Sequence, residues 1–190
     1  MRGLNPGRYA VARVGLRVAA LVGLVVLSGC GWMPFSSSSN APAQACPTTA
    51  ILRPLASTAM FSKAGTGMRP TDVAFYGILS EVDAKCETSG DTLRAKLDVI
   101  IAAERAAAGR GESVDLTYFV AVVGLDQTIL SKKSFAVRVP LPDTAKRGGV
   151  TDHIEELIAL GGRPAADLSI VLGFQHSPQA IDFYEHFRGR

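Results

Sequence analysis

The sequence has little of the chemistry that marks most enzymes and metal sites. Its 190 residues include only three histidines and three cysteines. It has no Gly-x-Ser-x-Gly nucleophile turn, no His-Glu-x-x-His zinc motif and no EF-hand loop. The segments "AGTG" and "GRGE" lack the Lys-Ser/Thr ending of a phosphate-binding loop, so we interpret them as turns. We therefore predict no catalytic residue, no metal site and no cofactor.

Histidines and acids do not form a local catalytic pattern. The three histidines are well separated in the sequence: His153, His176 and His186. A lone histidine is more often structural or solvated than catalytic. Asp152, Glu155 and Glu156 are close together, and we interpret them as solvent-facing charges of an edge strand, where charge discourages pairing with other chains. A hydrolase site around His176 remains as the alternative, and it requires a carboxylate or hydroxyl within hydrogen-bond distance of the ring.

Positive charge is also scarce once the first 29 residues are set aside. The whole chain has 20 Lys and Arg against 17 Asp and Glu, a net charge of +3. Four of the arginines lie in residues 1–17, which leaves 16 basic against 17 acidic residues from Cys30 onward, a net charge of −1. Nucleic-acid binding needs a stripe of basic side chains. We predict no nucleic-acid partner.

The start of the chain has the features of an export signal. Residues 1–17 carry arginine but no acidic residue, an uncharged apolar run covers residues 18–27, and Ser28 and Gly29 precede Cys30. A basic region, a short apolar region and small residues before a cleavage point are typical of a secretory signal peptide. The apolar run of about ten residues is half the roughly 20 that a membrane-spanning helix needs. We predict a signal peptide over 1–29; the alternative is an uncleaved helical anchor.

The tetrad Leu27-Ser28-Gly29-Cys30 resembles the lipobox of bacterial lipoproteins. The resemblance implies that a diacylglycerol is attached to the Cys30 thiol, that cleavage occurs before Cys30 and that the new amino terminus is acylated. Two or more acyl chains anchor a protein stably to a membrane. Gly31 stands where lipoproteins retained at the inner membrane commonly have aspartate. The resemblance therefore implies the outer membrane, with the protein facing the periplasm.

The other two cysteines, Cys46 and Cys86, fit this compartment. Disulfides form and persist outside the cytoplasm, and two cysteines allow a single pairing. Closing a loop of about 40 residues would stabilise the fold by roughly 4 kcal/mol, less any strain. The alternatives are two free thiols or a metal site, and a metal site would need histidines at short spacing. We predict a Cys46–Cys86 disulfide.

Two further segments follow the signal peptide. Residues 30–45 are rich in Ser, Ala and Pro and carry no charge. Such a composition predicts a flexible tether with a root-mean-square length of about 20 Å. Residues 46–190 have a length that suits one domain with one core.

Short runs of alternating apolar residues dominate 46–190 and predict about seven strands. These runs are "PTTAIL", "TDVAFYGIL", "TLRAKLDVII", "VDLTYFVAVVG", "SFAVRVPL", "TDHIEELIAL" and "DLSIVLGF". We predict an all-β, antiparallel sandwich of immunoglobulin-like or fibronectin type III-like architecture, with "VDLTYFVAVVG" as a central strand. The alternative is an α+β domain in which residues 92–110 form a helix, since Ala102–Ala108 is rich in alanine. The period of two over Leu93–Ile101 favours a strand.

The C-terminal segment changes to a helical period. Ser177 is a suitable N-cap and Pro178 a suitable first helical residue. The apolar residues at helical spacing are Ala180, Phe183, Tyr184 and Phe187. We predict a short helix that docks on the sandwich. The alternative is a helix that binds a partner or a membrane surface, but Asp182 and Glu185 argue against a membrane-surface helix.

The order of these features is similar to a group of small envelope lipoproteins of unknown function. The lipobox and Ser-rich tether are followed by "CPTTAIL", "EVDAKC", "YFVAVVG", "FAVRVPL" and "VLGFQHSP". The resemblance implies location and architecture. We predict a lipid-anchored, non-enzymatic binding or envelope-assembly module, with the membrane and an envelope protein as partners; the alternative is the hydrolase around His176.

Overall fold

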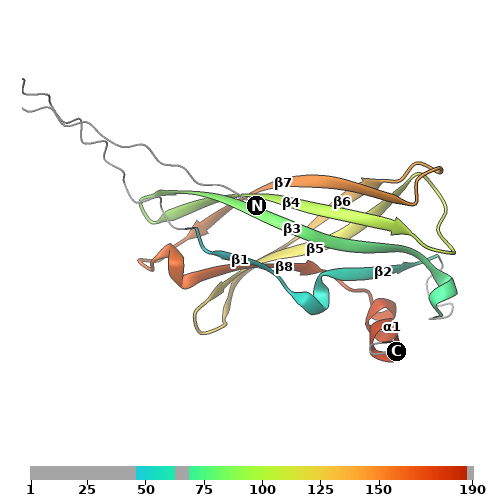
Figure 1. Cartoon of the computed structure of the whole chain (residues 1–190). Helices are drawn as coiled ribbons and strands as arrows, with labels where there is room; N and C mark the ends of the chain where they lie inside the picture. The colour runs from blue at the N-terminus through green and yellow to red at the C-terminus, as the bar shows by residue number, and fades with distance from the viewer. Residues whose placement is uncertain (1–45, 63–68, 188–190) are drawn as a thin grey trace, which may run out of the picture. The chain divides into compact units, whose positions relative to one another are not determined.

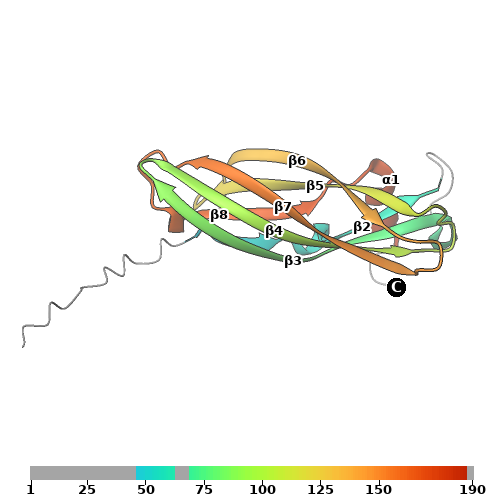
Figure 2. The ribbon, with the colours of Figure 1, turned by 90° about the horizontal axis from the view of Figure 1, so that it is seen from above.

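The computed structural model describes residues 46–62 and 69–187. This part consists of two four-stranded sheets packed face to face and one short C-terminal helix (Figures 1 and 2). The first sheet has the order β1 (Thr48–Ile51), β8 (Leu168–Phe174), β5 (Ser113–Gly124) and β6 (Ile129–Pro140). The second has the order β2 (Ser57–Phe61), β3 (Val73–Ser89), β4 (Thr92–Arg105) and β7 (Arg147–Ala159). Three short 3-10 turns, Arg53–Leu55, Pro70–Asp72 and Ala165–Asp167, and the helix α1 (Pro178–Phe187) complete it. The predicted sandwich-like fold is confirmed at this level.

The core lies between the sheets and follows the alternation in the sequence. In β4 every second side chain points inward and is at most 1% exposed: Leu93, Ala95, Leu97, Val99 and Ile101. Arg94 and Lys96, between them, are exposed. The strand continues to Arg105, so the first part of the alanine-rich segment is also extended. The helix alternative for residues 92–110 is wrong, because the two-residue period buries one face of a strand.

The strand β5 is central, as predicted. It pairs with β8 on one side and β6 on the other, and the run from Tyr118 to Val122 is buried on both faces. The outer face of this run is covered near Gly173, where a Cβ atom would lie 2.8 Å from Leu55 Cβ and 3.0 Å from the Phe119 ring. Glycine at 173 therefore lets the Arg53–Leu55 turn pack directly on the first sheet.

Three features differ from the predicted set of strands. The described part has eight strands, because Ser57–Phe61 forms β2, which pairs with β3 at the edge of the second sheet. The ladder between β1 and β8 is parallel, whereas all other ladders of the described residues are antiparallel. β3 is also much longer than the apolar run, since its polar half continues to Ser89 and pairs with β4 along its length.

The helix α1 begins where the sequence predicts. Its third amide, on Ala180, donates to the Ser177 hydroxyl at 3.2 Å, which is the expected cap. Phe183 is buried against Ala59 and Val73 on the outer side of the second sheet, and its ring lies 5.6 Å from the Phe61 ring, edge to face. The helix thus docks on β2 and β3, as predicted. No helix in residues 46–62 and 69–187 is long and apolar enough to cross a membrane.

Strand register defines the two ends of the sandwich. At one end β1 begins beside the start of β8, and the start of β8 pairs with the end of β5. The β3–β4 turn lies at the same end, because the amides of Gly161 and Gly162 in the β7–β8 loop donate to the Asp91 carboxylate at 3.0 and 2.8 Å. We call this the Cys46 end, and the opposite end, where Phe183 packs, the α1 end (Figure 1).

Candidate functional site

The predicted lipidation site, Cys30, lies outside the described residues, as do the signal peptide 1–29 and the rest of the segment 30–45. Lipidation, cleavage and the tether therefore stay predictions. The first residue that the structure describes is Cys46, which directly follows the predicted tether.

Cys46 and Cys86 form a disulfide, as predicted, with Cα atoms 5.4 Å apart. Cys46 directly precedes the first sheet, and Cys86 lies on β3 of the second sheet. The bond therefore joins the two sheets covalently at the point where the chain enters the sandwich. Both alternatives, free thiols and a cysteine metal site, are wrong for this pair.

His176 serves a structural contact. Its Nε2 lies 2.8 Å from the backbone oxygen of Ser57, and because a carbonyl only accepts, Nε2 must carry the proton. The imidazole also stacks on the Tyr184 ring at 5.3 Å. Tyr184 donates to the Ser57 hydroxyl at 3.4 Å, and burial raises the pKa of this tyrosine. Together these contacts tie the segment before α1, and α1 itself, to β2.

A hydrolase site around His176 would need an acid or a side-chain hydroxyl bonded to the ring. Glu185 lines the same shallow pocket as His176, together with Ile181. No carboxylate or side-chain hydroxyl of the described residues is hydrogen-bonded to the His176 ring, whose bond goes to a backbone oxygen. The arrangement supplies no base or orienting acid for this imidazole.

The other two histidines make local contacts. His153 on β7 lies opposite Asp98 on β4, with Nδ1 2.6 Å from Oδ1, on the solvent-facing side of the second sheet. His186 contacts the backbone oxygen of Asp182 one helical turn earlier, at 2.7 Å. In residues 46–62 and 69–187, no group of three or more His, Cys, Asp or Glu side chains could hold a metal ion.

The acids of β7 do not all face solvent. Glu155 does, and it forms an ion pair with Arg94. Glu156 points inward and is 4% exposed; its Oε2 lies 2.6 Å from Lys133 Nζ on β6, and Oε1 has no hydrogen-bond partner among the described residues. Asp152 also points inward and accepts from the Tyr118 hydroxyl at 2.8 Å. Burial and this carboxylate raise the pKa of Tyr118.

The solvent-facing interpretation is thus wrong for Glu156 and Asp152, for a reason that lies in the edge strands. β6 and β7 are the edges of their sheets on the same side of the sandwich. Inward-pointing charges on edge strands oppose edge-to-edge association, because another strand would have to cover them. The protective role of charge stays a prediction, and the buried Glu156 is paired with Lys133 across the two edge strands.

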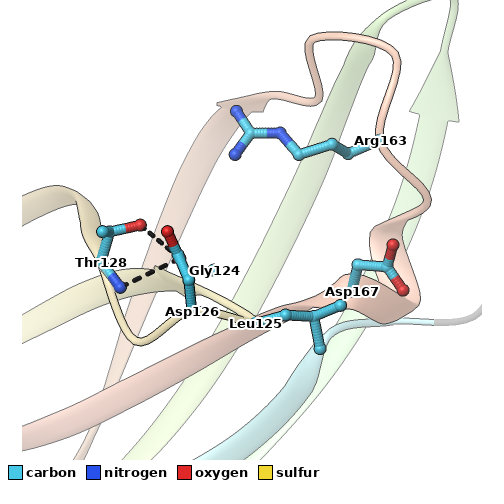
Figure 3. Close-up of a pocket in the computed structure, with 6 residues that line it drawn as sticks. All are labelled: Gly124, Leu125, Asp126, Thr128, Arg163 and Asp167. Carbon is cyan, nitrogen blue, oxygen red and sulfur yellow. Dashed lines mark hydrogen bonds between the residues drawn. The ribbon is translucent and has the colours of Figure 1, made fainter.

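A shallow pocket of about 250 Å³ opens at the Cys46 end (Figure 3). It is lined by residues from the β5–β6 turn and the β7–β8 loop: Gly124, Leu125, Asp126, Thr128, Arg163 and Asp167. Asp126 Oδ1 accepts from the Thr128 hydroxyl at 2.6 Å and from its amide at 3.2 Å, and these bonds lower the pKa of Asp126. Arg163 donates from Nε to the Leu160 oxygen at 3.0 Å, and its guanidinium extends over the pocket (Figure 3).

The pocket suits contact with a charged or polar surface better than catalysis. Thr128 is its only hydroxyl-bearing residue, and that hydroxyl already donates to Asp126. A nucleophile would need a base to accept its proton and donors to stabilise the developing charge. The pocket instead presents an exposed arginine, Arg163, and the apolar Leu125 side chain, which is 77% exposed.

Only weak local signals mark the position of this pocket in the sequence. "GLDQ" and "GGRP" are recognisable as turns, but their proximity depends on the pairing of Gly124 with Leu168 across the first sheet. Comparison with protein-family models, with curated proteins and with solved structures finds no match to this chain.

Proposed function

We propose that this chain is a lipid-anchored lipoprotein of the bacterial cell envelope, and that its sandwich is a non-enzymatic binding or assembly module. The observation that carries the proposal is the tetrad Leu27-Ser28-Gly29-Cys30, placed directly after a basic region and a short apolar run. The acyl chains on Cys30 anchor the protein, and Gly31 favours the outer membrane, with the sandwich in the periplasm.

The disulfide supports an oxidising compartment. Cys46 and Cys86 are bonded in the folded body, and such bonds persist in the periplasm but are rare in the reducing cytosol. Export of the chain accounts both for the signal-like start and for this bond.

The shape of the body supports a binding role. An immunoglobulin-like or fibronectin type III-like architecture is the finer part of this proposal. It is supported by two packed sheets between which the chain crosses at β1–β2, β4–β5, β6–β7 and β7–β8. Residues 129–134 of β6, at the edge of the first sheet, are exposed. Addition of a partner strand to such an edge is a common recognition mode.

The anchoring part is tested by intact mass of the mature protein and by a Cys30→Ser variant. We expect a mass that lacks residues 1–29, carries acyl groups and is reduced by the two hydrogens of one disulfide. Cys30→Ser should accumulate as an uncleaved precursor. Normal processing of this variant, with retention in the membrane fraction after a high-salt wash, would contradict the anchor.

The binding part is tested separately by crosslinking in membranes followed by pull-down. We expect a protein partner in stoichiometric amount, and a charged substitution on the open edge, Ser131→Asp, should reduce its yield several-fold. Glu155→Gln on the other edge strand is the control. Recovery of lipid and abundant envelope proteins alone would argue against a binding module.

A further inference from the structure

Exposed apolar side chains gather at the tip of the β5–β6 hairpin. Leu125 is 77% exposed, Ile129 64% and Leu130 40%, all within a span of six residues. Leu125 is the most exposed large apolar residue of the described part. Single exposed apolar residues are common on protein surfaces, whereas three within one hairpin tip raise the question of what covers them.

Basic side chains lie just behind this apolar tip. Lys132 is exposed and places Nζ 4.2 Å over the Phe119 ring, and Lys133 is 56% exposed while paired with Glu156. The exposed Arg163 lies across the pocket from the hairpin. Lys132 is three residues along the strand from Ile129, a rise of about 10 Å. Apolar side chains at the tip and cations one step above them match the depth profile of a membrane interface.

The acids near the tip are held by partners or set back from it. Asp126 is bonded to the amide and hydroxyl of Thr128. Asp167 lies on the far side of the pocket and is only part exposed. The tip therefore presents three exposed apolar side chains and the exposed Asp126, with basic groups behind them.

The chain enters the sandwich at this same end. Register links Thr48 on β1 to Ser169 on β8, Ser169 to Val123 on β5, and Val123 to Ile129 on β6. The entry point and the hairpin tip are thus three strand spacings apart, about 15 Å. Cys86, bonded to Cys46, fixes the entry point to the second sheet as well.

The length of chain between Cys30 and Cys46 favours this end, rather than the α1 end, at the membrane. Fifteen residues separate the two cysteines, and a coil of that length spans about 20 Å in root-mean-square terms. β4 alone, with 14 residues, extends about 45 Å toward the α1 end. A coil over residues 31–45 would therefore favour the Cys46 end beside the lipid and the α1 end in solution.

We propose that the β5–β6 hairpin tip is a membrane-surface contact: Leu125 and Ile129 enter the lipid interface, and Lys132 and Arg163 meet anionic headgroups. This contact rests on the proposed lipidation of Cys30. Because the acyl chains already hold the protein at the membrane, the effective concentration of lipid at the tip is high, and a small apolar surface is enough for the contact to form. The contact orients the sandwich so that the α1 end projects away from the bilayer.

Tryptophan quenching by brominated lipid tests the contact on the acylated mature chain. The chain is reconstituted in vesicles of phosphatidylethanolamine and phosphatidylglycerol, with the native indole removed by Trp32→Phe. Leu125→Trp reports on the tip. The matched control is Ile181→Trp, a surface site on α1 that is 45% exposed. Both sites are on the surface, so neither substitution should alter the fold, and unchanged thermal unfolding confirms this.

We expect brominated phosphatidylglycerol to quench the Leu125→Trp variant several-fold more strongly than the Ile181→Trp variant. Equal, weak quenching in acylated protein that floats with the vesicles would overturn the contact and leave the anchor intact. A blue shift that grows with protein concentration without quenching would assign the tip to a second copy of the chain and also overturn it. A mass without acyl groups would overturn the anchor itself, and the contact with it.

Discussion

The two ends of the sandwich are closed by different means. At the α1 end, closure is apolar: Phe183 packs on Ala59, Val73 and the edge of Phe61. At the Cys46 end it is covalent and polar, with the disulfide and the hydrogen bonds of Asp91 to the β7–β8 loop. The Cys46 end thus exposes several apolar side chains on one hairpin, whereas at the α1 end Phe183 is buried and Ile181 is 45% exposed.

The largest effect is expected from removal of the disulfide. A Cys46→Ser/Cys86→Ser variant should lose about 2–4 kcal/mol of unfolding free energy, because the unfolded chain regains the freedom of a loop of about 40 residues. Denaturant titration measures the loss. Amide exchange should accelerate in β1 and at the Cys46 end of β3, but not in α1. Reduction of the native protein is the control and should give the same pattern of exchange. Equal acceleration at both ends would contradict the expectation that the disulfide stabilises the Cys46 end alone.

Phe183→Ala should weaken the α1 end by about 3 kcal/mol, since it empties a buried aromatic site at the edge of the fold. Amide exchange should now accelerate in α1 and β2 and leave the Cys46 end unchanged. Ile181→Ala on the exposed side of the same helix is the matched control and should change stability by less than about 0.5 kcal/mol. A similar small loss for Phe183→Ala would show that the helix contributes little to closing this end.

Lys133→Met should cost about 2 kcal/mol, because it leaves the buried Glu156 carboxylate without its cation. Pairing it with Glu156→Leu should recover most of the loss, since an apolar pair of similar volume replaces the ion pair. Thermal unfolding of the two single variants and the double variant gives the coupling. Additive losses would mean that the two side chains do not depend on each other.

The smallest effects concern two carboxyl groups, one at each end. The Thr128 hydroxyl holds the pKa of Asp126 below its ordinary value, and Arg147, 2.9 Å away, does so for Glu104. Such groups favour the folded state above their ordinary pKa, and this contribution is lost as the pH falls through the lowered value. Thr128→Val should raise the pKa of Asp126 alone, and Arg147→Gln that of Glu104 alone. Carboxyl titration by NMR measures the two pKa values separately. A change in the pKa of both Asp126 and Glu104 in either variant would contradict the idea that the two ends titrate independently.

Most of the fold could be predicted from local pattern. β4 and β5 follow directly from which residues alternate, and the Ser177 cap with its helical stripe predicts α1. β2 escaped detection because "STAMF" is short and mixes small residues with apolar ones, so its strand character depends on pairing with β3. The parallel β1–β8 ladder likewise depends on partners more than 100 residues apart.

The side-chain details at the edges were harder to predict for the same reason. In "TDHIEELIAL" both faces carry apolar and charged residues, so alternation alone does not tell which face points inward. The structure buries Glu156 and exposes Leu157 to 57%, the reverse of what hydrophobicity favours. Lys133 on β6 makes this arrangement possible, and no spacing within β7 reveals it. The contact between the β5–β6 turn and the β7–β8 loop is equally non-local.

The disulfide also governs how mechanical tension would pass through the molecule. Without the disulfide, a force on the segment before Cys46 would detach β1 from β8, because their parallel ladder has only four residues. The disulfide to Cys86 holds the residue just before β1 and transmits the force to β3. β3 is hydrogen-bonded to β4 over most of its 17 residues. Force along such a ladder loads many hydrogen bonds in shear at once. If the protein were pulled between the membrane and a bound partner, the β3–β4 hairpin would therefore carry most of the force.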